Sequence, residues 1–189
     1  MGSQSQGASF VRYEPEQVAG IAQELRSLYG AVYAEPPYCE TESDAAEFES
    51  RLSSQVNEPA FSLFAAWDDD RLAGYIYGFA IESGSPLWTT VFLSPEPRYN
   101  LRDWTCPVAF VSELLVASNC RHRGIATVLH GAFVAARNEP KAVLLAHPEA
   151  TAAQTAYRAW GWYRIGSGRP WPNTPLYDTL VKDLASAKT

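Results

Sequence analysis

Two arginines and a glycine stand close together at Arg121, Arg123 and Gly124, between an apolar stretch and a helical pattern. Residues 108–117 predict a strand, and residues 124–137 predict a helix that starts directly after it. The first N–H groups of a helix lack partners and carry positive partial charge, so such a junction favours anions. A glycine there lets the backbone approach a bulky anion closely. The spacing therefore predicts that a ligand carrying phosphates docks at residues 121–127.

This loop differs from two common nucleotide-binding motifs. A nucleotide P-loop requires a Gly-Lys dipeptide, and the chain contains none. A dinucleotide fingerprint requires G-x-G-x-x-G after the strand, where R-x-x-G-x-A stands instead. The pattern found here resembles the pyrophosphate loop of the GNAT superfamily of N-acetyltransferases, R/Q-x-x-G-x-G/A.

A second motif of the same superfamily follows in the expected order. The family carries A-x-x-x-Y-x-x-x-G followed by an aromatic residue, and Ala153, Tyr157, Gly161 and Trp162 match it. The glycine ends a helix where positive φ is needed, and the aromatic residue enters the next strand. Together the two motifs cover residues 108–168, so the chain is identified as resembling a GNAT acetyltransferase. The Ala34 to Tyr38 loop also resembles actinobacterial members of unassigned substrate, and the small number of lysines fits a high-GC genome.

The resemblance implies that acetyl-CoA binds in a splay between the fourth and fifth strands. The pantetheine arm then pairs with the strand backbone at Leu114, Leu115 and Val116. The pyrophosphate lies beside Arg121, on the N–H groups of the loop and of the first helical turn. These groups belong to His122, Arg123, Gly124, Ile125, Ala126 and Thr127. Family members often carry an asparagine seven residues before the helix tyrosine, but Ala150 stands there. Gln154 is the substitute that we expect to contact the cofactor.

The reaction implied is attack of an amine on the thioester, through a tetrahedral oxyanion that the N–H of Val116 could stabilise. In the family Tyr157 faces the CoA sulfur, and a phenol can protonate the departing thiolate. Glu113 is the first candidate for the base or water-orienting group, and His147 is the second. The alternative for each is an ordinary structural role. His122 and His130 are expected on the loop and on the helix surface.

Three aromatic loops are expected around the acceptor. They cover residues 31–41, residues 82–107 and the turn at residues 169–175, and contribute Tyr33, Tyr38, Trp88, Trp104 and Trp171. Aromatic walls suit a flat or apolar small molecule, including a cationic one, although packing alone would also explain them. We expect N-acetylation of a small amine. A protein N-terminus or lysine, an antibiotic amine, a longer donor such as succinyl-CoA, and a non-catalytic acetyl-CoA sensor or partner-binding module remain alternatives.

The remaining patterns predict one α/β (α+β) domain over residues 10–185, after a flexible leader at residues 1–9. Helices are expected at residues 14–32, 41–54, 124–137 and 149–160. Strands are expected at residues 60–67, 71–81, 108–117, 141–146, 163–168 and 176–184. This order fits a GNAT-like mixed, mostly antiparallel sheet of about six to seven strands, flanked by about four helices.

Composition limits the partners. The net charge is −6, which argues against general nucleic-acid binding. Residues 14–58 are acidic and residues 121–189 are basic, which suits a cationic substrate and an anionic cofactor respectively. No apolar run is long enough to span a membrane, and Cys39, Cys106 and Cys120 lack metal-site spacing. We expect a cytoplasmic enzyme without a metal, and the resemblance leaves a homodimer open.

Overall fold

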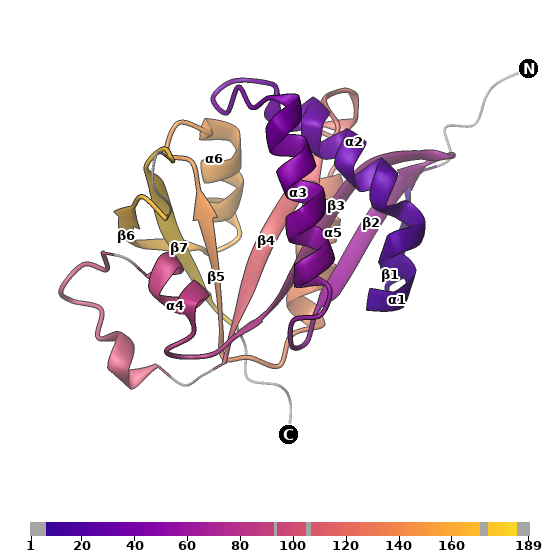
Figure 1. Ribbon diagram of the computed structural model, residues 1–189. Helices are drawn as coiled ribbons and strands as arrows, with labels where there is room; N and C mark the ends of the chain where they lie inside the picture. The colour runs from indigo at the N-terminus through magenta and orange to yellow at the C-terminus, as the bar shows by residue number, and fades with distance from the viewer. Residues whose placement is uncertain (1–6, 93, 105–106, 171–173, 185–189) are drawn as a thin grey trace, which may run out of the picture. The chain divides into compact units, whose positions relative to one another are not determined.

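The computed structural model describes residues 7–92, 94–104, 107–170 and 174–184 (Figure 1). Its elements follow in chain order: β1 (Ser9–Tyr13), α1 (Pro15–Val18), the 3₁₀ turn η1 (Ala19–Ile21), α2 (Ala22–Tyr33), α3 (Glu42–Gln55), β2 (Ser62–Asp68), β3 (Arg71–Ile81), α4 (Pro86–Val91), η2 (Leu101–Asp103), β4 (Val108–Val116), η3 (Ser118–Cys120), α5 (Ile125–Ala135), β5 (Lys141–Ala146), α6 (Thr151–Ala159), β6 (Tyr163–Gly168) and β7 (Tyr177–Asp183).

The strands form a seven-stranded sheet in the order β1-β2-β3-β4-β5-β7-β6. The pairs β1–β2, β2–β3, β5–β7 and β6–β7 are antiparallel. By contrast, β4 and β5 are parallel and pair at Ala109↔Ala142 and Phe110↔Val143. The predicted mixed, mostly antiparallel GNAT-like sheet with a splay at β4 and β5 is therefore confirmed.

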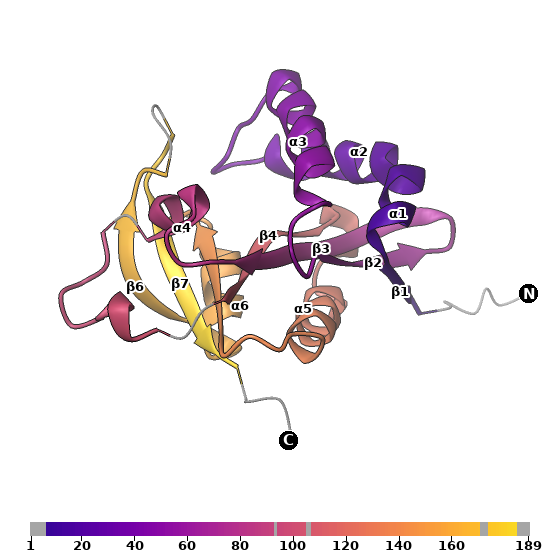
Figure 2. The same ribbon diagram turned by 60° about the horizontal axis from the view of Figure 1, so that its bottom comes forward.

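Two compact units divide the chain, and each is described by itself. The first comprises residues 1–78 and 113–136. In it α1, α2 and α3 cover one face of β1–β3, and α5 covers the other face (Figure 2). Large apolar side chains are fully buried between these layers, among them Leu25, Phe48, Leu63, Leu129 and Phe133. Such burial on both faces explains why β2 and β3 read as nearly continuous apolar runs.

The helix expected over residues 14–32 is divided in the structure. Pro15 starts α1, and the chain passes through the 3₁₀ turn before α2 begins. Gly20 is a weak helix former, and Ile21 leaves the helical region at φ −126° and ψ 12°. The second predicted helix is α3, which starts with a capping box between Thr41 and Asp44.

The second unit comprises residues 79–112 and 137–189. Its strands β5, β7 and β6 are flanked by α4 and α6 (Figure 1). The Thr179 hydroxyl of β7 donates to the carbonyl of Val91 at 2.8 Å and thereby fixes the end of α4. The Ser85 cap and Pro86 at the first turn explain why residues 86–91 are helical.

Two expectations need correction or remain open. Strand β1 was not predicted, and it begins at Ser9 inside the expected leader, of which residues 1–6 lie outside the described part. Its residues are mostly exposed, so they lack the alternating apolar pattern of a half-buried strand. The division into a leader and a single domain stays a prediction.

Candidate functional site

The predicted phosphate loop lies entirely in the first unit, between η3 and α5. His122 and Gly124 both adopt left-handed backbone, at φ 61° and φ 79°, on either side of Arg123. Left-handed residues in a tight loop turn successive N–H groups toward one concavity, which favours an anion. A Cβ added at Gly124 would meet nothing within 4 Å, so the space in front of this backbone is open.

The start of α5 supplies further donors. Gly124 is its N-cap and offers no side-chain hydrogen bond, and the first regular helical bond runs from the Val128 N–H to the Gly124 carbonyl. The N–H groups of Ile125, Ala126 and Thr127 precede that bond, so they have no acceptor within the helix. Loop and helix together present N–H groups from which an anion can accept hydrogen bonds, and the contact with the CoA pyrophosphate stays a prediction.

Both arginines of the loop carry carboxylate partners. Arg121 Nη1 lies 2.8 Å from Glu35 Oε2, and the Ser118 hydroxyl also donates to Glu35. Arg123 forms a bidentate ion pair with Asp68, in which Nη1 lies 2.7 Å from Oδ2 and Nη2 lies 3.0 Å from Oδ1. These contacts hold the pKa of Glu35 and of Asp68 below their usual values, for Glu35 through Ser118 first and Arg121 second. Each of the two arginines therefore lies at the loop and is already bound to a carboxylate.

A cavity of about 430 Å³ opens beside this loop, next to the β2–β3 turn. Its lining includes Asp68, Asp69 and Asp70 on one side and Asn119 and Cys120 on the other. Three carboxylates disfavour a phosphate group, so the anion is better matched by the N–H groups of the loop than by this cavity.

The strand β4 carries Glu113 into the core of the first unit. Its side chain is buried and accepts two hydrogen bonds, from the Tyr33 hydroxyl to Oε2 at 2.7 Å and from Arg51 Nη2 to Oε1 at 2.7 Å. On the same strand Leu115 is buried, whereas Leu114 and Val116 are partly exposed. The structure thus joins the predicted base to Tyr33, one of the predicted acceptor residues.

A group of aromatic residues surrounds this ion pair. The ring of Tyr33 lies 4.5 Å from those of Tyr29 and Tyr38, centroid to centroid. The Arg51 guanidinium lies 5.7 Å from the centroid of Tyr29. Burial raises the pKa of Glu113, and Arg51 opposes that rise. Burial also raises the pKa of Tyr33 well above its ordinary value, so this phenol keeps its proton.

Arg51 and Glu40 are functional candidates that sequence reasoning did not identify. Arg51 stands on α3, far from Glu113 in the chain, and no local motif connects the two. Glu40 stands in the loop before α3, and its Oε2 is buried without a hydrogen-bond partner. The sequence offered one signal for Arg51, which is one of only two arginines in the otherwise acidic residues 14–58.

Tyr157 lies on α6 in the second unit and is buried at 9% relative exposure. Its ring meets those of Trp160 and Trp162 edge-on, each at 5.8 Å between centroids. Gly161 ends the helix at φ 83°, as its motif position requires, and Trp162 is buried at the start of the turn into β6. These rings fix where the phenol ring lies.

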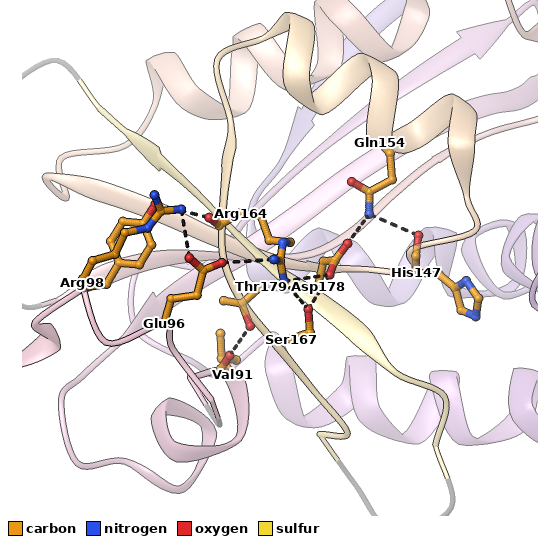
Figure 3. A network of polar contacts seen from close by, with 10 residues as sticks. Val91, Glu96, Arg98, His147, Gln154, Arg164, Ser167, Asp178 and Thr179 are labelled. Carbon is orange, nitrogen blue, oxygen red and sulfur yellow. Dashed lines mark hydrogen bonds and ion pairs between the residues drawn. The ribbon is translucent and has the colours of Figure 1, made fainter.

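Gln154 and His147 belong to a polar network in the same unit (Figure 3). Gln154 Nε2 donates to the His147 carbonyl at 3.3 Å and to Asp178 Oδ2 at 3.2 Å. Asp178 also accepts from the Ser167 hydroxyl at 2.6 Å. The amide group expected to contact the cofactor is therefore engaged in holding α6 to the ends of β5 and β7.

His147 is buried, and its Nδ1 accepts from the N–H of Glu149 at 3.2 Å. Nδ1 is therefore engaged in a local hydrogen bond with the backbone, and the role of His147 as a base stays a prediction. His130, expected on the surface of α5, is instead buried at 6% exposure because that helix is apolar on most of its faces. His122 is exposed in the loop as expected.

The aromatic residues of the second unit gather around Phe92. Trp88 is buried, and its ring lies 4.5 Å from that of Phe92, while Trp104 meets Phe92 edge-on at 5.4 Å. Lys141 Nζ lies 5.1 Å from the centroid of Trp104. Trp171, the remaining predicted acceptor residue, lies outside the described residues. Trp88 and Trp104 thus pack within the unit, and their acceptor role stays a prediction.

Comparison with known proteins decides the family. The sequence model of the Acetyltransferase (GNAT) family matches residues 22–162, which is more than half of the chain. The chain belongs to the GNAT acetyltransferase family. It is therefore an acetyltransferase, and acetyl-CoA is its co-substrate. No curated protein matches the sequence.

Solved structures share the fold at low identity. A PaiA N-acetyltransferase from Thermoplasma acidophilum, in complex with coenzyme A, is 13% identical with a TM-score of 0.57, over 93% of this chain and 99% of that one. The ribosomal-protein-S18-alanine N-acetyltransferase from Escherichia coli is 11% identical with a TM-score of 0.62, over 96% of each chain. AAC(6')-Iy, in complex with a bisubstrate analogue, is 14% identical with a TM-score of 0.61, over 90% of this chain and 100% of that one. At such identities the likeness shows the fold alone.

Among the residues that the structure describes, no helix combines the length and the apolar character that crossing a membrane requires. Within the same residues, no group of three or more histidine, cysteine or carboxylate side chains is arranged to hold a metal ion.

Proposed function

We propose that this acetyltransferase moves the acetyl group of acetyl-CoA to the nitrogen of a small amine, by direct attack through a tetrahedral intermediate. The hydrogen bond from Tyr33 to Glu113, at 2.7 Å, carries the proposal. It connects a tyrosine of the expected acceptor loop to a buried carboxylate that can accept or direct the proton of an ammonium group.

Glu113 is proposed as the base or water-orienting group. Arg51 and Tyr33 each bind one of its oxygens, and each oxygen keeps a second lone pair for an amine or a water molecule. The ammonium of the acceptor loses its proton to this carboxylate, directly or through water. The nitrogen then forms its bond to the acetyl carbon and gives the tetrahedral intermediate, and the carbon–sulfur bond breaks when this intermediate collapses. His147 is kept as the second candidate for this proton transfer.

Tyr157 is proposed as the acid that gives its phenolic proton to the departing thiolate. The N–H of Val116 is proposed to stabilise the oxyanion, and Leu114, Leu115 and Val116 to pair with the pantetheine arm. The N–H groups of residues 122–127 and the two loop arginines are proposed to hold the pyrophosphate. The left-handed backbone of His122 and Gly124, and the open space at Gly124, support that role.

A small amine is favoured over a peptide because the first unit brings tyrosines and carboxylates together in one cluster. The free thiols of Cys39 and Cys120 fit a reducing compartment, so the proposal places the enzyme in the cytoplasm. The family resemblance leaves a homodimer open, and light scattering of the purified protein tests it.

The experiment combines binding with turnover. Thermal unfolding is followed with acetyl-CoA, succinyl-CoA and CoA, and thiol release is then measured with a panel of small amines and of N-terminal and lysine peptides. The proposal expects stabilisation by acetyl-CoA and thiol release with small amines. Release with peptides alone contradicts the acceptor class, and binding without turnover of any amine favours the sensor.

A further inference from the structure

Residues 34–40, which we call the strap, lie between α2 and the N-cap of α3 and depend on polar contacts for their place. All seven residues are exposed or half-buried, so none of their side chains is fully buried in the core. Segments with few buried contacts open at low cost in free energy. Hydrogen bonds and ion pairs therefore carry more of the anchoring of the strap than packing does.

Glu35 attaches the strap to the turn between β4 and α5. The Ser118 hydroxyl donates to Glu35 Oε1, and Arg121 Nη1 lies 2.8 Å from Oε2. These contacts, Ser118 first and Arg121 second, lower the pKa of Glu35, so the carboxylate keeps its charge. Because each oxygen has a donor of its own, the contact with Ser118 can persist when the phosphates of the cofactor take Arg121.

A second attachment lies one residue before the strap. There the Tyr33 hydroxyl donates to Glu113 Oε2 at 2.7 Å. The two attachments reach Glu113 on β4 and Ser118 just after that strand, so they flank residues 114–116 in the chain. These three residues are the ones proposed to pair with the pantetheine arm. The strap is therefore fastened beside the strand segment where the thioester is expected.

The backbone of Glu35 connects its side chain to Tyr38. The Glu35 carbonyl accepts from the N–H of Tyr38 at 3.1 Å and from that of Cys39 at 3.3 Å. The chain thus turns back, and the Tyr38 ring meets that of Tyr33 edge-on, at 4.5 Å between centroids and 89° between planes. The attachment of Glu35 therefore helps to determine where Tyr38 stands beside the hydrogen bond from Tyr33 to Glu113.

We propose that Glu35 is a positioning residue for acetyl transfer, which fastens the strap to the turn at Ser118 and Arg121 and so holds Tyr38 against Tyr33 at the acceptor site. This rests on the proposed function, because the acceptor is proposed to react beside Tyr33 and Glu113. Glu35 acts through Tyr38 and not on the reacting atoms. Loosening the strap therefore impairs binding of the acceptor and leaves binding of the cofactor intact.

The first test separates the two substrates. Steady-state rates are measured with the small amine that the wild type acetylates fastest, for the wild type, Glu35→Ala, Ser118→Ala and Ser118→Thr. The control is Glu49→Ala, since Glu49 is another surface carboxylate in an ion pair, with Arg26 at 3.3 Å.

The amine KM should rise about ten-fold in Glu35→Ala, which loses both contacts, and about three-fold in Ser118→Ala. Ser118→Thr keeps the hydroxyl, so its KM should match the wild type, as should that of Glu49→Ala. Ser118→Ala should have no further effect in a Glu35→Ala background, because its partner is gone. In every variant kcat should stay within about two-fold of the wild type, and acetyl-CoA affinity should not fall.

A second arm follows the strap itself and needs no turnover. Hydrogen exchange of residues 34–40 is measured by mass spectrometry on the wild type, Glu35→Ala and Glu49→Ala, with correction for intrinsic rates. The N–H groups of Tyr38 and Cys39 bind the Glu35 carbonyl, and that of Glu40 donates to the Tyr33 carbonyl at 2.9 Å, so they report on opening. Exchange should be about five-fold faster in Glu35→Ala and unchanged in Glu49→Ala. Equal exchange of β3 in all three proteins shows that each is folded.

Three outcomes overturn the proposal. The first is strap exchange in Glu35→Ala that equals the wild type. The second is an unchanged amine KM in that variant. The third is an equal rise of KM in Glu49→Ala, which would show general surface electrostatics. Each of these leaves amine acetylation intact. A wild type that acetylates no amine contradicts the proposed function instead, and the exchange arm then still decides whether Glu35 fastens the strap.

Discussion

Glu35 and Arg121 form an ion pair at 2.8 Å, which links the loop after α2 to the phosphate loop. Arg123 is paired in the same way with Asp68, at 2.7 Å. Both pairs lie at the surface, where ion pairs are weak and a phosphate group can compete for the guanidinium. The pairs therefore offer a way to determine which arginine reaches the pyrophosphate.

Replacing each carboxylate should release its arginine. If Arg121 contacts the phosphates, Glu35→Gln should tighten acetyl-CoA binding by about two- to five-fold at low salt. If Arg123 contacts them, Asp68→Asn should have that effect. The matching Arg121→Ala or Arg123→Ala should weaken it by about ten-fold. Calorimetric titration with acetyl-CoA measures all four variants. Unchanged affinity in both alanine variants would show that the backbone alone holds the anion.

Gly124→Ala tests the geometry of the loop. The residue has φ 79°, and an added Cβ meets no other atom within 4 Å, so the expected cost is backbone strain of about 1 kcal/mol without a clash. The methyl group also enters the space offered to the anion, so acetyl-CoA affinity should fall. Urea unfolding and calorimetry give the two quantities.

Gly131→Ala is the matched control, because Gly131 lies within α5 and also has open space around its Cα. Alanine there should stabilise the protein by about 0.5–1 kcal/mol and leave acetyl-CoA binding unchanged. An equal loss of affinity in both variants would contradict the role of the loop.

Arg51→Gln tests the ionisation of Glu113. Burial raises the pKa of Glu113, and the charge of Arg51 lowers it, so removing that charge should raise the pKa further. A base is inactive when protonated, so activity is lost as the pH falls through its pKa. The acid limb of kcat/KM should therefore move to higher pH, by about one pH unit.

The pH profile is compared with that of Arg71→Gln, which removes an exposed arginine from the start of β3. We expect the acid limb of this control to match the wild type. If the Arg51→Gln profile also matches, then Glu113 is not the group that controls the reaction.

Local patterns in the sequence predicted much of the fold. The bounds of β5 agree with the prediction at both ends, since a continuous apolar run marks a central strand. The junction before α5 was also predicted, because the chemistry of a helix start depends on adjacent residues. Strand β1 was missed because its exposed residues carry no such pattern.

The contacts of the candidate site were less predictable. Arg51 and Glu113 are 62 positions apart, and their pairing depends on how α3 packs on the sheet. Gln154 was expected to contact the cofactor, but its bond to Asp178 arises from the neighbouring β7 and is invisible in the motif. Motifs thus indicated the reaction class, whereas the ion pair between Arg51 and Glu113 required the structure.

The central claim is that Tyr157 protonates the leaving thiolate in amine acetylation. The most direct measurement is thiol release with acetyl-CoA and an amine, with the product identified by mass, for the wild type, Tyr157→Phe and the control Tyr163→Phe. Tyr163 lies on β6, and its hydroxyl donates to Asp183 at 3.3 Å. The account predicts that Tyr157→Phe lowers kcat by about 10²–10⁴. The acetyl-CoA Kd of Tyr157→Phe should stay within about two-fold of the wild type, and so should the rates of Tyr163→Phe. Full activity in Tyr157→Phe, or a wild type that acetylates no amine, would contradict it.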